Sequence, residues 1–179
     1  MCSSWLRRLD QGDTLFLYRR KNDSFKPPTD KGVLMVGAGT GVAPYLGFLD
    51  HLSLHTPHLP TLLVTGNRFK ARDSIYAEEF TAHQAAGVLK SYRTAYSRDQ
   101  GSTCKYVQDV LERDARDIVA FLDEGAAVYV CGDAKGLGAG VFEMLRTILE
   151  KEKGLGREEA EGILMEMKKK KLYCEDIWS

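Results

Sequence analysis

The strongest constraint on this chain is the regular alternation of short apolar runs with longer segments of helical periodicity. Apolar runs predict strands at 33–36, 61–65 and 127–131, and the less apolar stretch 92–96 predicts another. Helical spacing predicts helices at 42–54, 73–86, 105–113, 115–124, 134–151 and 157–170. Strands that are apolar on both faces and connected through helices are typical of a parallel sheet between two helical layers. Because such crossovers are right-handed, the predicted fold class is α/β, with a doubly wound parallel sheet in a three-layer α/β/α arrangement.

The part of the chain before this alternation has a different character. Residues 14–20 are predicted to form a further strand, and the polar, proline-containing stretch 21–31 is predicted to connect it to the rest. We therefore expect a domain boundary near Pro28.

The composition excludes several classes of protein. The 179 residues include 25 basic and 25 acidic side chains, so no excess positive charge is available to hold a nucleic acid. No run approaches the roughly 20 apolar residues that cross a bilayer, and the first residues lack the apolar core of a signal peptide. The four cysteines form no CxxC pair, which indicates free thiols and no metal site. The expected localisation is cytoplasmic.

A glycine-rich stretch at 37–44, GAGTGVAP, joins the first predicted strand to the first predicted helix. Glycines let backbone amides approach a phosphate, and a helix N-terminus favours negative charge, so this loop is interpreted as a pyrophosphate cradle. The alternative is a tight structural turn. The loop departs from the dinucleotide fingerprint GxGxxG, because Val42 stands at the last glycine position.

Polar residues follow the second and third predicted strands. An NAD site would place an acidic residue after the second strand, but this chain has Asn67 and Arg68 there. Ser97 and Arg98 follow the third strand, and Lys105 and Tyr106 open the next predicted helix. Cations and hydroxyls of this kind suit a 2'-phosphate, which favours NADP over NAD. The alternative is a set of solvated surface residues.

Two further features lie near the end of the chain. Cys131 closes the fourth predicted strand, where a cysteine is either a small core residue or part of a site. The last residues, YCEDIWS, carry two aromatic side chains and acidic residues where termini are usually polar. Trp178 could cap a core or stack on a flat ligand.

Five motifs together resemble the diflavin reductase family. They are GAGTGVAP at 37–44, YSRD at 96–99, KYVQ at 105–108, YVCGDAK at 129–135 and DIWS at 176–179, in family order. The resemblance covers essentially the whole chain and is strongest to the NADPH-cytochrome P-450 reductase and methionine synthase reductase branches. It implies a ferredoxin-NADP reductase-like NADP(H)-binding module of a flavoprotein oxidoreductase.

The resemblance also implies roles for individual residues. The NADPH pyrophosphate would be held by Gly39, Thr40 and Gly41, and Asp133 would add to the NADPH site. The adenosine 2'-phosphate end would be surrounded by Arg68, Ser97, Arg98, Lys105, Tyr106 and Gln108. Cys131 and Asp176 would assist hydride transfer, and Trp178 would cover the FAD ring until nicotinamide displaces it. Ser3 would bind the FAD pyrophosphate.

The family further implies an electron-transport path from NADPH to FAD, then to FMN, and then to a haem or cobalamin protein. Residues 1–28 resemble the end of an FAD-binding β-barrel domain, and residues 29–179 the NADP(H)-binding domain. The rest of the FAD domain and the FMN domain are expected upstream, and an endoplasmic-reticulum location would require an N-terminal anchor. The competing hypothesis is a nucleotide-binding or regulatory module with no turnover of its own.

Overall fold

The computed structural model describes residues 2–18, 22 and 25–178, without the side chains of Cys2 and Ser3. Its centre is a five-stranded parallel sheet in the order β3-β2-β1-β4-β5. The strands are β1 (Val33–Ala38), β2 (Thr61–Asn67), β3 (Ser91–Tyr96), β4 (Ala127–Asp133) and β5 (Tyr173–Trp178). The predicted α/β fold with a parallel sheet is confirmed.

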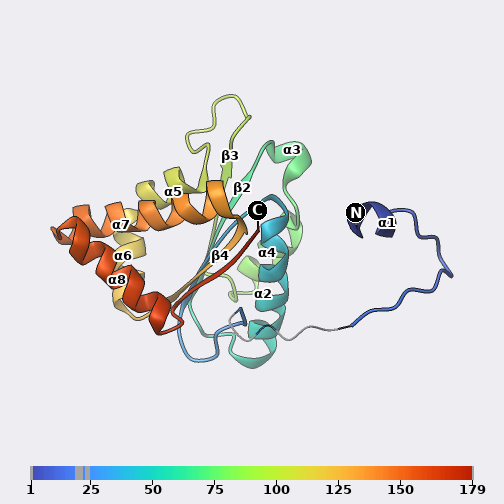
Figure 1. Cartoon of the computed structure of the whole chain (residues 1–179), viewed down its shortest axis with the longest axis horizontal. Helices are drawn as coiled ribbons and strands as arrows, with labels where there is room; N and C mark the ends of the chain where they lie inside the picture. The colour runs from blue at the N-terminus through green and yellow to red at the C-terminus, as the bar shows by residue number, and fades with distance from the viewer. Residues whose placement is uncertain (1, 19–21, 23–24, 179) are drawn as a thin grey trace.

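Helices cover both faces of the sheet (Figure 1). One face packs against α2 (Ala43–His55) and α4 (Ala77–Ala85); the other packs against α5 (Val107–Arg113), α6 (Ala115–Asp123), α7 (Ala139–Lys153) and α8 (Arg157–Lys169). Successive strand side chains point to opposite faces, so Val36 joins one core and Met35 the other. This two-sided burial explains why the inner strands are apolar without interruption.

The connections of the sheet change direction beside β1. The chain leaves β1 through α2 to reach β2 on one side, whereas β4 on the other side of β1 is reached through α5 and α6. The hydroxyl of Tyr45 in α2 donates to the carbonyls of Val36 and Tyr129 at 2.8 and 2.9 Å, which ties this helix to both strands. Ligands of doubly wound sheets bind at such a divergence, beyond the carboxyl ends of the strands.

Three short elements occupy the loops at those carboxyl ends. They are the 3-10 turn η1 (Gly39–Val42) after β1, the single turn α3 (Lys70–Asp73) after β2, and the π-helical turn η2 (Ala134–Gly138) after β4. The helix predicted at 73–86 corresponds to α4, which begins only at Ala77, and the one predicted at 134–151 is divided between η2 and α7.

The two ends of the chain differ from expectation. The final strand β5 was not predicted, because it is an edge strand that carries Glu175 and Asp176 in an otherwise apolar pattern. The predicted strand at 14–20 is wrong for the described residues 14–18, which pair with no other strand. They follow α1 (Cys2–Leu6) in a segment that extends away from the sheet (Figure 1). An extended segment is a strand only when a neighbour completes its hydrogen bonds.

The body of the fold begins at Phe25, whose ring packs against Tyr45, Phe48 and Tyr129 with centroids 5.2 to 6.3 Å apart. Over the described part of the chain, no helix has the length and apolar character needed to cross a membrane.

Candidate functional site

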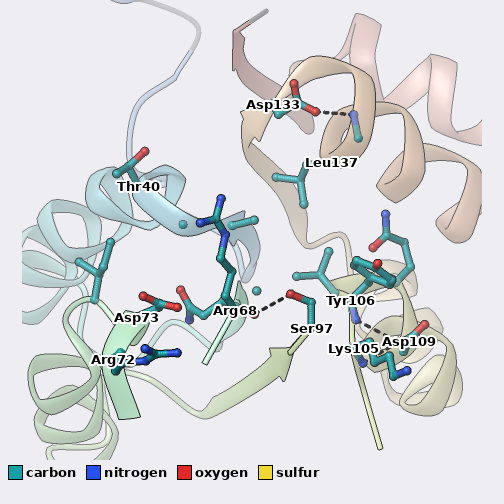
Figure 2. A pocket seen from close by; sticks show the side chains of 18 of the residues that line it. Thr40, Arg68, Arg72, Asp73, Ser97, Lys105, Tyr106, Asp109, Asp133 and Leu137 are labelled. Atoms are coloured by element: carbon teal, nitrogen blue, oxygen red, sulfur yellow. Dashed lines mark hydrogen bonds between the residues drawn. The ribbon is translucent and has the colours of Figure 1, made fainter. Parts of the chain in front are cut away.

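A cleft of about 940 Å³ opens at the carboxyl ends of β1, β2 and β4 (Figure 2). Its lining includes nine of the residues that the sequence assigned to the site, namely Gly39, Thr40, Arg68, Ser97, Lys105, Tyr106, Gln108, Asp133 and Trp178. These residues come from five separate loops and strand ends. The parallel sheet brings them together because all its strands end at the same edge.

The glycines of the first loop have different structural reasons. Gly39 has a φ of +53°, and a Cβ at this position would meet no atom within 4 Å, so its backbone faces open space in the cleft. Gly41 instead lies against β4, where a Cβ would come within 2.2 Å of the Cys131 carbonyl oxygen. The turn therefore keeps its backbone both exposed to the cleft and tightly packed behind it, as a phosphate cradle requires.

The loops after β2 and β3 remain hydrogen-bonded beyond the strands. The Ser97 amide donates to the Asn67 carbonyl, and the Arg98 amide donates to the Arg68 carbonyl, both at 2.9 Å. This pairing holds Arg68 and Ser97 next to each other at the cleft. The Arg98 side chain is exposed and does not line the cleft.

The opposite wall of the cleft is formed by the start of α5. Asp109 Oδ2 accepts from the backbone amides of Lys105 at 2.7 Å and Tyr106 at 3.0 Å, which fixes the turn that presents both side chains. Tyr106 is 61% exposed, so its ring is available for stacking. The Gln108 side chain packs against Gly140 of α7. A Cβ on residue 140 would be 2.1 Å from the Gln108 amide nitrogen.

Cys131, Asp176 and Trp178 lie together at the β4–β5 edge. Cys131 pairs in register with Asp176, and Asp133 pairs with Trp178. Cys131 is 2% exposed, and burial, with a smaller contribution from Asp176, raises the pKa of its thiol from 9.0 to about 11. The thiol is therefore neutral at physiological pH. Asp176 is exposed, and Trp178 is 47% exposed at the rim of the cleft.

Asp133 and Ser3 remain of the residues that the sequence assigned to the site. The Asp133 carboxylate accepts from the Gly136 amide and so caps η2, while still lining the cleft. The side chain of Ser3 lies outside the described residues, so its predicted role with FAD stays a prediction.

The sequence reasoning missed Arg72, Ile75 and Asp109, all of which line the cleft. Arg72 belongs to the single turn α3, which was interpreted as loop. The only sequence signal for Asp109 is its position three residues into a helix, where an acidic side chain can cap the first turn.

The lining is suited to an extended anionic ligand with a flat ring. Arg68, Arg72 and Lys105 supply positive charge, whereas the acidic residues Asp73 and Asp109 bind backbone amides of their own loops. No acidic residue ends β2, where an unphosphorylated ribose would be bound. Among the described residues, no three His, Cys, Asp or Glu side chains are grouped so that they could hold a metal ion.

Comparisons with known proteins agree with this geometry. A family model described as "Oxidoreductase NAD-binding domain" matches residues 35–143. Methionine synthase reductase of Mus musculus is 34% identical over 100% of this chain and 30% of its own length. The sulfite reductase [NADPH] flavoprotein alpha-component is 36% identical in Bacillus subtilis, over 96% of this chain and 28% of that protein. The Vibrio cholerae protein of the same name is 35% identical over 98% of this chain and 29% of its own length. The chain thus spans less than a third of each of these relatives.

Proposed function

The chain belongs to the oxidoreductase NAD-binding domain family, as the NADP(H)-binding part of a diflavin reductase, and from that premise we propose that its cleft binds NADPH for hydride transfer to FAD. In this proposal NADPH supplies the hydride, and FAD receives it and passes electrons through FMN to a haem or cobalamin protein. The mouse relative's name gives methionine synthase as the protein that is reduced, and we take a protein of that kind as the acceptor. The P-450 reductase branch is the second candidate.

The observation that carries the proposal is the composition of the cleft beside β2 and β3. Arg68, Ser97 and Lys105 meet there, and the acidic residue that would accept from a free ribose hydroxyl is absent. Two cations and a hydroxyl provide charge-assisted hydrogen bonds to a 2'-phosphate, whereas the uncharged ribose of NAD offers them no partner.

The first loop would hold the pyrophosphate. The exposed backbone of Gly39 and the Thr40 hydroxyl both border the cleft, and Tyr106 stands where adenine could stack on its ring. The part of the cleft between these groups and Trp178 is lined by Asp133, Gly136 and Leu137, which lie in or next to η2.

The residues at the β4–β5 edge would serve the nicotinamide. The exposed Asp176 carboxylate stabilises positive charge that develops on the ring as hydride leaves. Cys131 keeps its proton because its pKa is raised to about 11, so it can align the ring without exchanging protons. Trp178 would cover the flavin ring and would have to move before nicotinamide could stack there. A module without turnover would need none of these three.

The same proposal assigns residues 1–28 to the end of an FAD-binding domain and residues 29–179 to the NADP(H)-binding domain. The exposure of Phe16, Leu17 and Tyr18, at 96%, 84% and 91%, supports it, because consecutive large apolar side chains are normally covered by a neighbouring domain.

Titration of the chain with NADP⁺, NAD⁺ and 2'-phospho-AMP by isothermal calorimetry tests the nucleotide assignment. We expect NADP⁺ and 2'-phospho-AMP to bind and NAD⁺ to bind at least about tenfold more weakly, as for the loss of one charge-assisted contact. Equal affinities for NAD⁺ and NADP⁺ would contradict the phosphate pocket.

The hydride step has its own test. NADPH is mixed with a dye acceptor, first with the chain alone and then with a longer chain that carries the FAD-binding part. Dye reduction is expected only when FAD is held next to the nicotinamide. Rapid reduction in the absence of FAD would overturn the assignment of FAD as the hydride acceptor.

A further inference from the structure

Three cations line the cleft without an acidic partner. Five of the ten arginines in the described part of the chain pair with carboxylates, namely Arg93, Arg113, Arg116, Arg146 and Arg157. In contrast, Arg68, Arg72 and Lys105 form no ion pair in the part of the chain that the structure describes. Unpaired positive charge gathered around one cleft indicates that its partner is an anionic ligand.

Arg72 lies in α3, a single turn that three side-chain hydrogen bonds hold in place. Asp73 Oδ2 accepts from the Phe69 amide at 3.1 Å, and Asp99 Oδ2 accepts from the Lys70 amide at 2.9 Å. Ser74 Oγ donates to the Lys70 carbonyl at 2.8 Å. Because Asp99 belongs to the loop after β3, this network joins α3 to the loop that carries Ser97.

The guanidinium of Arg72 is itself positioned by a neighbour. Its Cζ lies 4.2 Å from the centroid of the Phe69 ring. A guanidinium seated on an aromatic face keeps its N–H groups in its plane, where they remain free to donate. Figure 2 shows Arg72 pointing into the cleft from the α3 side, with Lys105 on the other side.

Arg68 has a different direction from Arg72. Its side chain rises through the middle of the cleft toward the side of Thr40, away from the level of Arg72 and Ser97 (Figure 2). It is therefore the cation best placed to reach the pyrophosphate as well as the adenosine. Arg72 and Lys105 line the cleft nearer the level of Ser97, so they can add to the positive charge that Arg68 supplies there.

We propose that Arg72 is a specificity-determining residue that binds the 2'-phosphate of NADP(H) from the α3 side, opposite Lys105. The inference rests on the proposed function, because it requires that a nucleotide with a 2'-phosphate occupies the cleft. A dianionic phosphate between a guanidinium and an ammonium receives charge from both sides, and the planar fork of arginine can bind two of its oxygens at once. Arg72 thus adds a contact that the sequence motifs did not assign.

The test compares Arg72→Met with Lys70→Met. Methionine keeps an apolar stem over Phe69 and removes the charge. Lys70 is a matched control, because it lies in the same turn but is exposed and does not line the cleft. Both variants are titrated with NADP⁺, 2'-phospho-AMP and NAD⁺, and thermal unfolding checks that each is folded.

We expect Arg72→Met to weaken NADP⁺ and 2'-phospho-AMP binding about tenfold, the effect of one charge-assisted contact, and to leave NAD⁺ binding unchanged. Lys70→Met should stay close to the wild type for all three ligands, and Arg72→Lys should recover part of the loss. Equal losses of NADP⁺ affinity in the Arg72 and Lys70 variants would show that only the net charge of the protein matters, and would overturn the proposal.

The outcome also separates this inference from the proposed function. A wild-type chain that prefers NADP⁺, with an Arg72→Met variant of the same preference, refutes the role of Arg72 and leaves the NADPH assignment standing. A wild-type chain without any preference for NADP⁺ refutes both.

Discussion

Gly41 shows how a single residue joins the cleft to the core. It is buried, and the position of its missing Cβ is filled by the backbone of Cys131 and Gly132. The close approach of η1 to β4 therefore depends on the absence of a side chain. The same approach brings the phosphate loop near the thiol and carboxylate at the β4–β5 edge.

Gly41→Ala should destabilise the protein by about 2 kcal/mol, because backbone atoms would have to move to admit a methyl group. Gly47→Ala is the matched control: Gly47 lies in α2 with nothing within 4 Å of its Cβ position, so alanine should raise the unfolding free energy by up to about 1 kcal/mol. Urea denaturation measures both. Equal stability of the two variants would contradict the packing described for Gly41.

The raised pKa of Cys131 predicts how the stability of the fold depends on pH. Burial, and secondarily Asp176, raise its pKa from 9.0 to about 11, so the folded state holds the thiol proton more tightly than the unfolded state. The stabilisation from this group is complete below about pH 9 and is lost as the pH rises toward 11. Alkylation of Cys131 in the folded protein, followed by peptide mass spectrometry, should show the same midpoint.

Substitutions in β5 separate the two causes of this shift. Asp176→Asn should lower the midpoint of Cys131 alkylation only in part, because burial remains. Glu175→Gln is the control, since Glu175 pairs with Lys168 at 2.8 Å and does not contribute to the Cys131 shift. An alkylation midpoint near pH 9 in the wild-type protein would contradict the raised pKa of the Cys131 thiol.

At the scale of elements, the first turn of α5 positions one wall of the cleft. Asp109→Ala removes the acceptor of two backbone amides and should lower the unfolding free energy by about 1 kcal/mol, as for loss of a helix cap. NADP⁺ affinity should fall as well, because Lys105 and Tyr106 lose their fixed turn. Asp117→Ala in the first turn of α6, an exposed acidic position outside the cleft, should change affinity little. Calorimetry with NADP⁺ compares the two, and equal affinities would contradict the positioning role of Asp109.

Strand β5 places Trp178 at the rim of the cleft. In a longer chain that includes the FAD-binding part, Trp178→Ala should strengthen NADP⁺ binding by up to about tenfold, because nicotinamide no longer has to displace a stacked ring. Trp178→Phe should give an intermediate affinity, and release of the nucleotide should become slower. Unchanged NADP⁺ affinity in the alanine variant would contradict this role of Trp178.

The sequence pattern is plainest in the elements whose faces are covered. β1 and β4 read as uninterrupted apolar runs because both faces are covered, and α7 and α8 show one apolar stripe because one face is covered. β5 was missed because an edge strand with partly exposed side chains has no such pattern. The wrong strand at 14–18 has strand-forming residues but no described neighbour to pair with.

The site was predictable to the extent that it follows strand ends. Gly39, Arg68, Ser97 and Lys105 stand in loops whose place at one sheet edge follows from parallel topology alone. Arg72 could not be found in this way, because its direction depends on the hydrogen bonds that fasten α3 and on the ring of Phe69.

At the scale of the whole molecule, function depends on the strand order. Because β1 lies between β2 and β4, loops that are far apart in sequence meet over one cleft, with the phosphate loop in its middle. In the proposed complex, the adenosine side would be built by β2, β3 and α5, and the hydride-transfer side by β4 and β5. The sheet thereby separates the part that recognises the nucleotide from the part that would face the flavin.

The central claim is that NADP(H) binds in this cleft, and amide chemical shifts in a ¹⁵N-labelled chain titrated with NADP⁺ test it most directly. The largest changes are expected at Gly39–Val42, at Arg68 and Ser97, and at Lys105 and Tyr106, with smaller changes for NAD⁺ beside β2 and β3. Changes that cluster instead at the amino ends of the strands, or saturable binding that leaves these amides unmoved, would contradict it.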